Sequence, residues 1–304
     1  MSRFGNFWSL IAKNESGGVL ILVAFLIVAL LGMTALVIDV GYLYQGRRDM
    51  VNAADGAALA GAQELIFNDN WGEVESYSEN YANSNYDSDI GLVTATVLDS
   101  NTIEVITGKT VDFTFARVLG FNSSDVPARA VAINAPLVRM KGLVPVAFRE
   151  DEYLGSDPGD DADFIEFHVL GPGSWGVVSF EGHGTGQTPF PIADYITNGY
   201  PGYVELADPD VYVAVGAAGA GAQPAVRSAL EGRIGDEVYV PIVRGSVTGS
   251  QWIEVVGFAA VIFDSVTGKG ANIAVSGKFI RSVGPGDIDR DAEDFGLKGV
   301  ALIE

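Results

Sequence analysis

The chain has 304 residues, of which 48% are hydrophobic and 19% charged, and its formal charge is −21. This length and composition are typical of a globular protein with room for two domains, and they exclude a disordered chain. The acidic balance, with 39 acidic against 18 basic residues, disfavours nucleic acid as a partner, because phosphate binding needs a concentrated basic face. The absence of cysteine rules out disulfides, thiolate metal sites and a cysteine nucleophile.

The strongest single feature is the apolar run VLILVAFLIVALLGMTALVI, Val19 to Ile38. It carries no charge and has about the length that a bilayer-spanning helix needs. A cleaved signal peptide and a buried soluble helix are the alternatives, but the run is longer than a signal h-region and no A-x-A-like site follows it. We therefore expect a single-pass membrane protein in the lipid bilayer, with residues 1–18 as a short cytoplasmic segment and the acidic remainder outside the cytoplasm.

The helical pattern continues beyond the apolar run, with residues spaced alternately by three and four positions. This spacing predicts one transmembrane and extended helix over 19–67, about 70 Å long. Glycine costs about 1 kcal/mol relative to alanine inside a helix, so the small residues on the stripe predict a closely apposed helix or sheet face. A plain alanine-rich helix with tolerated glycines is the alternative. Ala57 is assigned to a different face, and the predicted packing interface consists of Val51, Ala54, Ala58, Gly61 and Leu65.

Residues 68–138 predict a small α/β domain in which strand-like alternation follows a helical segment. A long helix packed on such a sheet is a pilin-like arrangement, and the sheet is a partner for the small-residue stripe. The predicted elements are a helix over 71–82, strands over 90–98 and 102–108, a second helix over Val111 to Leu119, and a strand over 128–134.

The segment ALVIDVGYLYQGRRDMVNAADGAALAGAQEL, residues 35–65, resembles the N-terminal signature of TadG-like proteins of the Flp (tight-adherence) pilus assembly group. Its signature residues are Asp39 at the outer edge of the apolar span, then Asn52 and Asp55 in the alanine-rich block. FARVLGFNSSDVPARAVA, residues 115–132, resembles the next block. The resemblance implies a non-enzymatic, membrane-anchored envelope protein of pilus assembly or adhesion, with other Tad pilus or envelope proteins as partners.

The alternative is a pilin-like subunit that polymerises through the same helix into a filament at the cell surface. Pilin-type precursors of the related TadE pattern carry a glutamate five residues after the cleaved glycine. Here those positions hold Leu22, counted from Gly17, and Val23, counted from Gly18. The buried salt bridge that such a glutamate makes with a neighbouring subunit is therefore missing, which favours the assembly or adhesion protein over a homo-oligomeric filament.

Residues 139–304 alternate in eight short runs bounded by Gly, Pro and Asp, after a boundary near 136–142. This pattern predicts a β-rich extracytoplasmic domain, interrupted by one helix over 223–235 with Val226, Leu230 and Ile234 on one face. The fold class is therefore α+β: a long N-terminal transmembrane helix, a small pilin-like α/β domain and a larger, mainly antiparallel, β-sandwich-like domain.

Catalytic machinery is hard to find in this sequence. His168 falls in a predicted strand and His183 in a loop, and neither has the context of a triad; no G-x-S-x-G, P-loop or H-E-x-x-H motif occurs. We therefore expect no enzyme and no catalytic residue. A carbohydrate-binding or hydrolytic β domain on a stalk is a third interpretation, but core packing explains the aromatic residues of this region equally well.

Two acidic clusters deserve comparison with calcium loops, because calcium prefers oxygen ligands in flexible loops. The second cluster departs from the EF-hand pattern, with Ala292 at the turn glycine and Lys298 at the closing glutamate. Solvated loops explain both clusters better, so we expect no cofactor and keep calcium as a minor alternative. The clusters are Asp157, Asp160, Asp161 and Asp163, and Asp287, Asp289 and Asp291.

Overall fold

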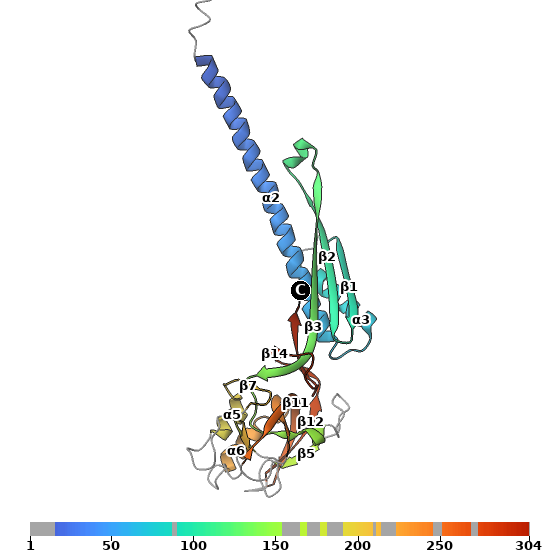
Figure 1. The fold of residues 1–304 in the computed structure, drawn as a ribbon, viewed down its shortest axis with the longest axis vertical. Helices are drawn as coiled ribbons and strands as arrows, with labels where there is room; N and C mark the ends of the chain where they lie inside the picture. The colour runs from blue at the N-terminus through green and yellow to red at the C-terminus, as the bar shows by residue number, and fades with distance from the viewer. Residues whose placement is uncertain are drawn as a thin grey trace, which may run out of the picture.

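The fold is α+β, with a long apolar N-terminal helix and a β-rich larger region, as predicted (Figure 1). Apart from this helix, the elements form an antiparallel sheet beside the helix's lower half and a second, β-rich body below it. The computed structural model describes residues 16–86, 90–153, 165–168, 177–180, 191–208, 211–213, 223–245, 251–268 and 273–303.

The long helix, α2, runs without interruption from Ser16 to Glu64. The predicted continuous helix is therefore confirmed, and at 1.5 Å per residue it is about 70 Å long. The large apolar side chains of its first part, before Asp39, are exposed, and its second half lies against the sheet (Figure 1). By length and composition it is the one described helix able to cross a membrane.

The sheet beside α2 follows the order β1-β2-β3-β15-β13, with β7 and β14 also paired to β3. Strands β1, β2, β3 and β15 are antiparallel to their neighbours, and β13 is parallel to β15. Helices α2 and α3 pack on one face of this sheet and share its core. The bounds are α3 Trp71–Asn85, β1 Leu92–Asp99, β2 Thr102–Asp112, β3 Ser123–Met140, β7 Val204–Glu205, β13 Ser282–Val283, β14 Gly286–Ile288 and β15 Leu297–Leu302.

The predicted second helix over Val111 to Leu119 is wrong. Strand β2 continues to Asp112, and only a short 3-10 helix, η1 (Ala116–Leu119), follows it. The β-branched and aromatic residues at 110–115 suit an extended strand better than a helix. Gly120, at φ 93°, then reverses the chain into β3 in a left-handed conformation that glycine adopts without strain.

The larger region is built on a five-stranded sheet in the order β4-β9-β11-β12-β5, antiparallel except for the β4–β9 pair. Helices α5 and α6 cover one face, and the three-stranded sheet β10-β8-β6 contributes to the cover of the other. The bounds are β4 Phe148–Arg149, α4 Glu150–Tyr153, β5 Ile165–His168, β6 Val178–Ser179, α5 Ile192–Asn198, β8 Tyr212–Val213, α6 Gln223–Glu231, β9 Glu237–Arg244, β10 Gln251–Trp252, β11 Glu254–Thr267 and β12 Ala274–Ile280.

Two details of this region differ from the sequence prediction. The single predicted helix is joined by α4 and α5, and it ends at Glu231, so Val226 and Leu230 are buried while Ile234 lies exposed beyond its end. Strand β3 runs through the predicted boundary near 136–142, and β15 returns to pair with it. The sheet beside α2 thus contains residues from both sides of that boundary.

Candidate functional site

The buried face of α2 is broader than the predicted stripe. Ala54, Ala58, Gly61 and Leu65 are buried, whereas Val51 is 37% exposed. The assignment of Ala57 to a different face is wrong, because Ala57 is fully buried. A straight helix has 3.6 rather than 3.5 residues per turn, and a sheet plus α3 covers more of its circumference than one partner helix does. We call this face the α2 seam: Met50, Ala53, Ala54, Ala57, Ala58, Gly61, Ala62 and Leu65.

Small side chains let α2 approach its neighbours closely along the seam. A Cβ atom at Gly61 would lie 2.6 Å from Cδ1 of Ile103 on β2 and 3.1 Å from Oγ of Ser78 on α3. One turn above the seam, a Cβ atom at Gly46 would lie 2.8 Å from Cγ2 of Val111. All three distances are shorter than most Cβ contacts, so any larger residue would displace the neighbouring side chain.

Buried polar side chains fix the position of α2 along the sheet. The Thr107 hydroxyl of β2 donates to the Met50 carbonyl at 2.9 Å, and the Ser78 hydroxyl of α3 donates to the Ala57 carbonyl at 2.7 Å. Both hydroxyls are buried, and buried polar groups are costly when left without a partner. A shift of α2 by one residue would break both bonds, so these contacts specify its register.

Asn134 of β3 also fixes the position of α2, near the end of the helix. Its Nδ2 donates to the Ala62 carbonyl at 3.0 Å, and its Oδ1 accepts a 2.7 Å hydrogen bond from Nδ2 of Asn101. The last carbonyls of a helix have no intrahelical donor, and the Ile66 amide bonds to Gln63 instead of Ala62. Asn134 therefore satisfies one terminal carbonyl of α2. Sequence reasoning missed these polar contacts; the signal was a polar residue at an inward position of an otherwise apolar pattern.

Asp39 holds the loop between β2 and β3 against α2. Its Oδ1 accepts hydrogen bonds from the amides of Thr114 (2.8 Å) and Phe115 (3.3 Å), and its Oδ2 accepts from Phe115 (3.0 Å) and Ala116 (2.6 Å). The Asp39 side chain lies just after the apolar run, and only 2% of the residue is exposed. Burial raises the pKa of Asp39, but the three amide donors outweigh it, and the pKa falls below its ordinary value. We call this arrangement the Asp39 latch.

The α2 seam and the Asp39 latch lie within the residues that match two protein families. Residues 17–64 match the family described as putative Flp pilus-assembly TadE/G-like, and residues 47–132 match the one described as putative Tad-like Flp pilus-assembly. Residues 17–132 are therefore similar to TadG-like proteins. The two matches together take in α2, α3, β1, β2, the latch and the first part of β3. No curated protein and no solved structure matches the chain.

The other two signature residues of the TadG-like segment lie outside the seam. Asn52 is exposed and Asp55 is half-buried. Burial raises the pKa of Tyr86, at the end of α3, and the charge of Asp55 adds to the same effect. Asp55 therefore faces the end of α3, and the structure does not bring it together with Asp39, which lies 16 residues earlier on the helix.

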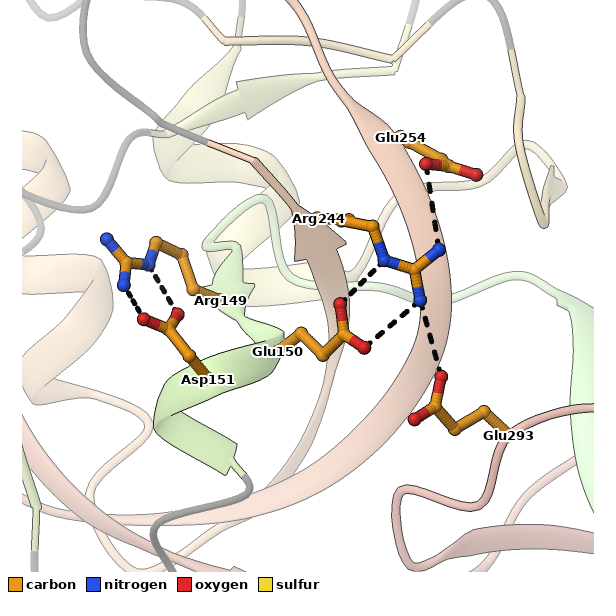
Figure 2. Close-up of polar contacts among 6 residues, drawn as sticks. All are labelled: Arg149, Glu150, Asp151, Arg244, Glu254 and Glu293. Atoms are coloured by element: carbon orange, nitrogen blue, oxygen red, sulfur yellow. Dashed lines mark hydrogen bonds and ion pairs between the residues drawn. The ribbon is translucent and has the colours of Figure 1, made fainter.

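The β-rich region of the chain carries an ionic cluster around Arg244 (Figure 2). Arg244 binds Glu150 in a bidentate pair, with distances of 2.7 and 3.0 Å, and also approaches Glu293 at 3.4 Å and Glu254 at 3.8 Å. The hydrogen bond from Arg244 holds the pKa of Glu150 below its ordinary value, although burial opposes this. The cluster joins α4 to β9, β11 and the segment before β15, and every carboxylate in it faces the guanidinium.

Among the residues that the structure describes, the candidate catalytic and metal-binding side chains form no recognisable centre. His168 lies in β5, whereas His183 and the cluster from Asp157 to Asp163 lie outside the described residues. In the second acidic cluster, Asp287 pairs with Arg139 at 3.3 Å and Asp289 accepts the Asp291 amide at 3.0 Å. Within the described ranges, no group of three or more His, Cys, Asp or Glu residues is placed to hold a metal ion.

A cavity of about 490 Å³ lies where the end of α2 meets the β1–β2 turn and residues 281–298. The charged groups on its wall include Asp294 and Lys298, which pair at 3.0 Å. Ser100 also lines it, but its hydroxyl donates to Oδ1 of Asn101 at 2.7 Å. No histidine is among the described lining residues, and the cavity lies at the junction between the two sheets.

Proposed function

We propose that this chain is a non-enzymatic, membrane-anchored protein of a Tad/Flp pilus assembly or adhesion system, with every element after the apolar half of α2 outside the cytoplasm. The observation that carries the proposal is the division of α2 at Asp39. Before this residue, large apolar side chains are exposed; from Met50 onward, mostly small residues are buried against the chain's own sheet.

The exposed half of α2 needs a partner that the described chain does not supply. The apolar run Val19 to Ile38 is about 30 Å long, which matches the hydrocarbon core of a bilayer. Each large aliphatic side chain moved out of water contributes about 1.5–3 kcal/mol, so lipid around this run stabilises it strongly. The family matches supply the setting, since both describe pilus-assembly proteins.

The polar contacts of the described residues support a structural role. The polar groups of the seam and the latch bond to backbone atoms, and the carboxylates around Arg244 are paired. These contacts position elements and leave no nucleophile beside a base. Partners of such a chain are other pilus or envelope proteins, contacted through the β-rich region that projects away from α2 (Figure 1).

The orientation can be tested with single cysteines, because the natural chain has none. Leu98→Cys, at an exposed position of β1, should react with a membrane-impermeant maleimide added to spheroplasts. Ser2→Cys should react only after the membrane is permeabilised. The reverse labelling pattern would place the sheet in the cytoplasm and would contradict the proposal.

A pilin-like subunit remains the second candidate, because the projecting half of α2 can also be covered by neighbouring copies. The α2 seam is already filled by the chain's own sheet, so polymerisation would have to use the half before Asp39. Electron microscopy of the purified full chain separates the two candidates. Single particles in detergent support the assembly or adhesion protein, and regular filaments support the pilin-like subunit.

A further inference from the structure

The tip of the β2–β3 hairpin, residues 113–121, exposes apolar side chains that the fold does not use. Phe115 is 43%, Val118 88% and Phe121 64% exposed, all within seven residues. Isolated exposed apolar residues are common on protein surfaces, but a cluster of this kind marks a contact site. The tip stands apart from the β-rich region, at the far end of the hairpin and beside α2 (Figure 1).

The Asp39 latch fixes where this tip lies along α2. Asp39 directly follows Ile38, the last residue of the apolar run, and its carboxylate binds the amides of residues 114–116. The close approach of Gly46 to Val111 and the Thr107–Met50 hydrogen bond hold the hairpin further down. When α2 spans a bilayer, the tip must therefore lie at the level where the helix leaves the hydrocarbon.

We propose that the hairpin tip is a second membrane contact, which rests its apolar side chains in the interfacial layer of the leaflet that α2 leaves. The proposal depends on the membrane anchoring proposed above. Tyrosine favours this layer, and Tyr42 and Tyr44 of α2 are exposed at the adjoining level. Phenylalanine side chains, such as those of the tip, are typical of the apolar face of segments that lie in the interface. Arg117, also exposed at the tip, has a long side chain that reaches headgroups while its aliphatic part stays apolar.

The chemistry of the tip fits the interface rather than the hydrocarbon. Irregular backbone is not tolerated against lipid chains, because its amides and carbonyls need partners. In the tip, the Asp39 carboxylate satisfies three amides, and the Gly120 and Phe121 amides bond to the carbonyls of Arg117 and Ala116. The backbone is therefore largely paired, and apolar side chains can enter the interface without exposing free amides.

Two membrane contacts would hold the sheet in a fixed orientation. A single helix allows the attached domains to rotate and tilt about its exit point. A hairpin tip at the same bilayer surface adds a second point of support, so the β-rich region would project from the membrane at a defined angle. This would present its far end to a partner in one direction.

The test uses the full chain in phosphatidylcholine vesicles, with an environment-sensitive fluorophore on one introduced cysteine. Val118→Cys reports on the tip, Leu98→Cys is the control on the same sheet about 30 Å away, and Leu30→Cys reports on the span. We expect lipid-borne nitroxides near the headgroup to quench the Val118→Cys label and shift its emission to the blue. Nitroxides deep in the chains should quench the Leu30→Cys label, and neither should quench Leu98→Cys.

The outcomes separate this inference from the proposed anchoring. Quenching at Leu30→Cys without quenching at Val118→Cys would overturn the tip contact and leave the anchor intact, and crosslinks between Val118→Cys chains would then identify a second copy as its cover. No quenching at Leu30→Cys would overturn the anchoring itself. Adding Asp39→Asn to Val118→Cys should cause a loss of headgroup quenching, and unchanged quenching would overturn the role of Asp39 in setting the depth.

Discussion

The two halves of α2 share one unbroken helix but carry opposite side-chain patterns. Before Asp39 the apolar side chains are large and exposed, as at Leu26 and Leu30. After Met50 the apolar side chains are mostly alanine and are fully buried, as at Ala54 and Ala58. Exposure of a continuous run of large apolar residues reverses the ordinary rule for soluble proteins.

The difference shows that side-chain size along this helix records the kind of neighbour. Lipid chains adapt to any shape, so bulky residues suffice in the first half. A sheet and a second helix are fixed surfaces, and only small residues allow their backbones to come close. The change occurs between Asp39 and Met50. At the start of this stretch, Asp39 binds the loop between β2 and β3.

The largest effect is expected from charge introduced into the first half of α2. We expect the double variant Leu26→Arg/Leu30→Arg to lose stable membrane insertion, because each arginine at the centre of a span costs about 3 kcal/mol. Val51→Arg, on the partly exposed edge of the second half, is the control and should remain in the membrane fraction. Carbonate extraction measures both, and full retention of the double variant would contradict a lipid-facing first half.

The second half should respond to size rather than charge. Ala58→Leu adds methylenes where α2 meets the sheet, and we expect a loss of about 1–3 kcal/mol in the free energy of unfolding. Gln63→Leu puts the same side chain on the exposed side of α2 and should be nearly neutral. Denaturant titration of the full chain in detergent measures both, and equal small effects would mean that the seam is not tightly packed.

The polar contacts of the seam should give a smaller effect. Thr107→Val keeps the shape of the side chain but removes the donor to the Met50 carbonyl, so we expect a loss of about 1 kcal/mol. Thr107→Ser retains the hydroxyl and is the matched variant for recovering the hydrogen bond. If valine proved as stable as threonine, this hydrogen bond would not contribute to the register of α2.

The smallest effect is expected outside the helix, at Glu150. Its pKa is lowered by Arg244, so the pair stabilises the fold above the ordinary glutamate pKa, near 4.3, and this contribution disappears as the pH falls through the lower folded value. Glu150→Gln should therefore lower the melting temperature modestly at pH 7 and show a shallower decline below pH 4. Glu254→Gln is the control for a weaker contact of Arg244.

The local sequence pattern was enough to predict the helices and strands that have a clear hydrophobic periodicity. The apolar run, the helix at Trp71 and the first two strands were all recognisable from the pattern of apolar residues in the sequence. The burial of Ala57 could not be predicted in this way. A heptad pattern assumes one helical partner, whereas α2 packs against a sheet and a helix together.

Contacts between segments that lie far apart in the chain could not be predicted from the sequence. Asp39 and Ala116 lie 77 residues apart, and Arg244 and Glu150 lie 94 apart. Nothing local marks such pairs, since exposed acids and arginines occur throughout the chain. The predicted helix over 111–119 was wrong in part for the same reason: in addition to the local preference of residues 110–115 for a strand, Asp39 binds the amides of residues 114–116.

Strand β3 has a mechanical consequence for a membrane-anchored, pilus-related protein. It joins the β-rich region to the sheet beside the membrane helix, and eleven successive residues, Ser123 to Ile133, pair with β2. The hydrogen bonds of an antiparallel pair lie perpendicular to the strands. Tension applied to the β-rich region would therefore load these hydrogen bonds in shear. The bonds would share the force rather than break one after another, so the connection to the membrane helix would resist pulling.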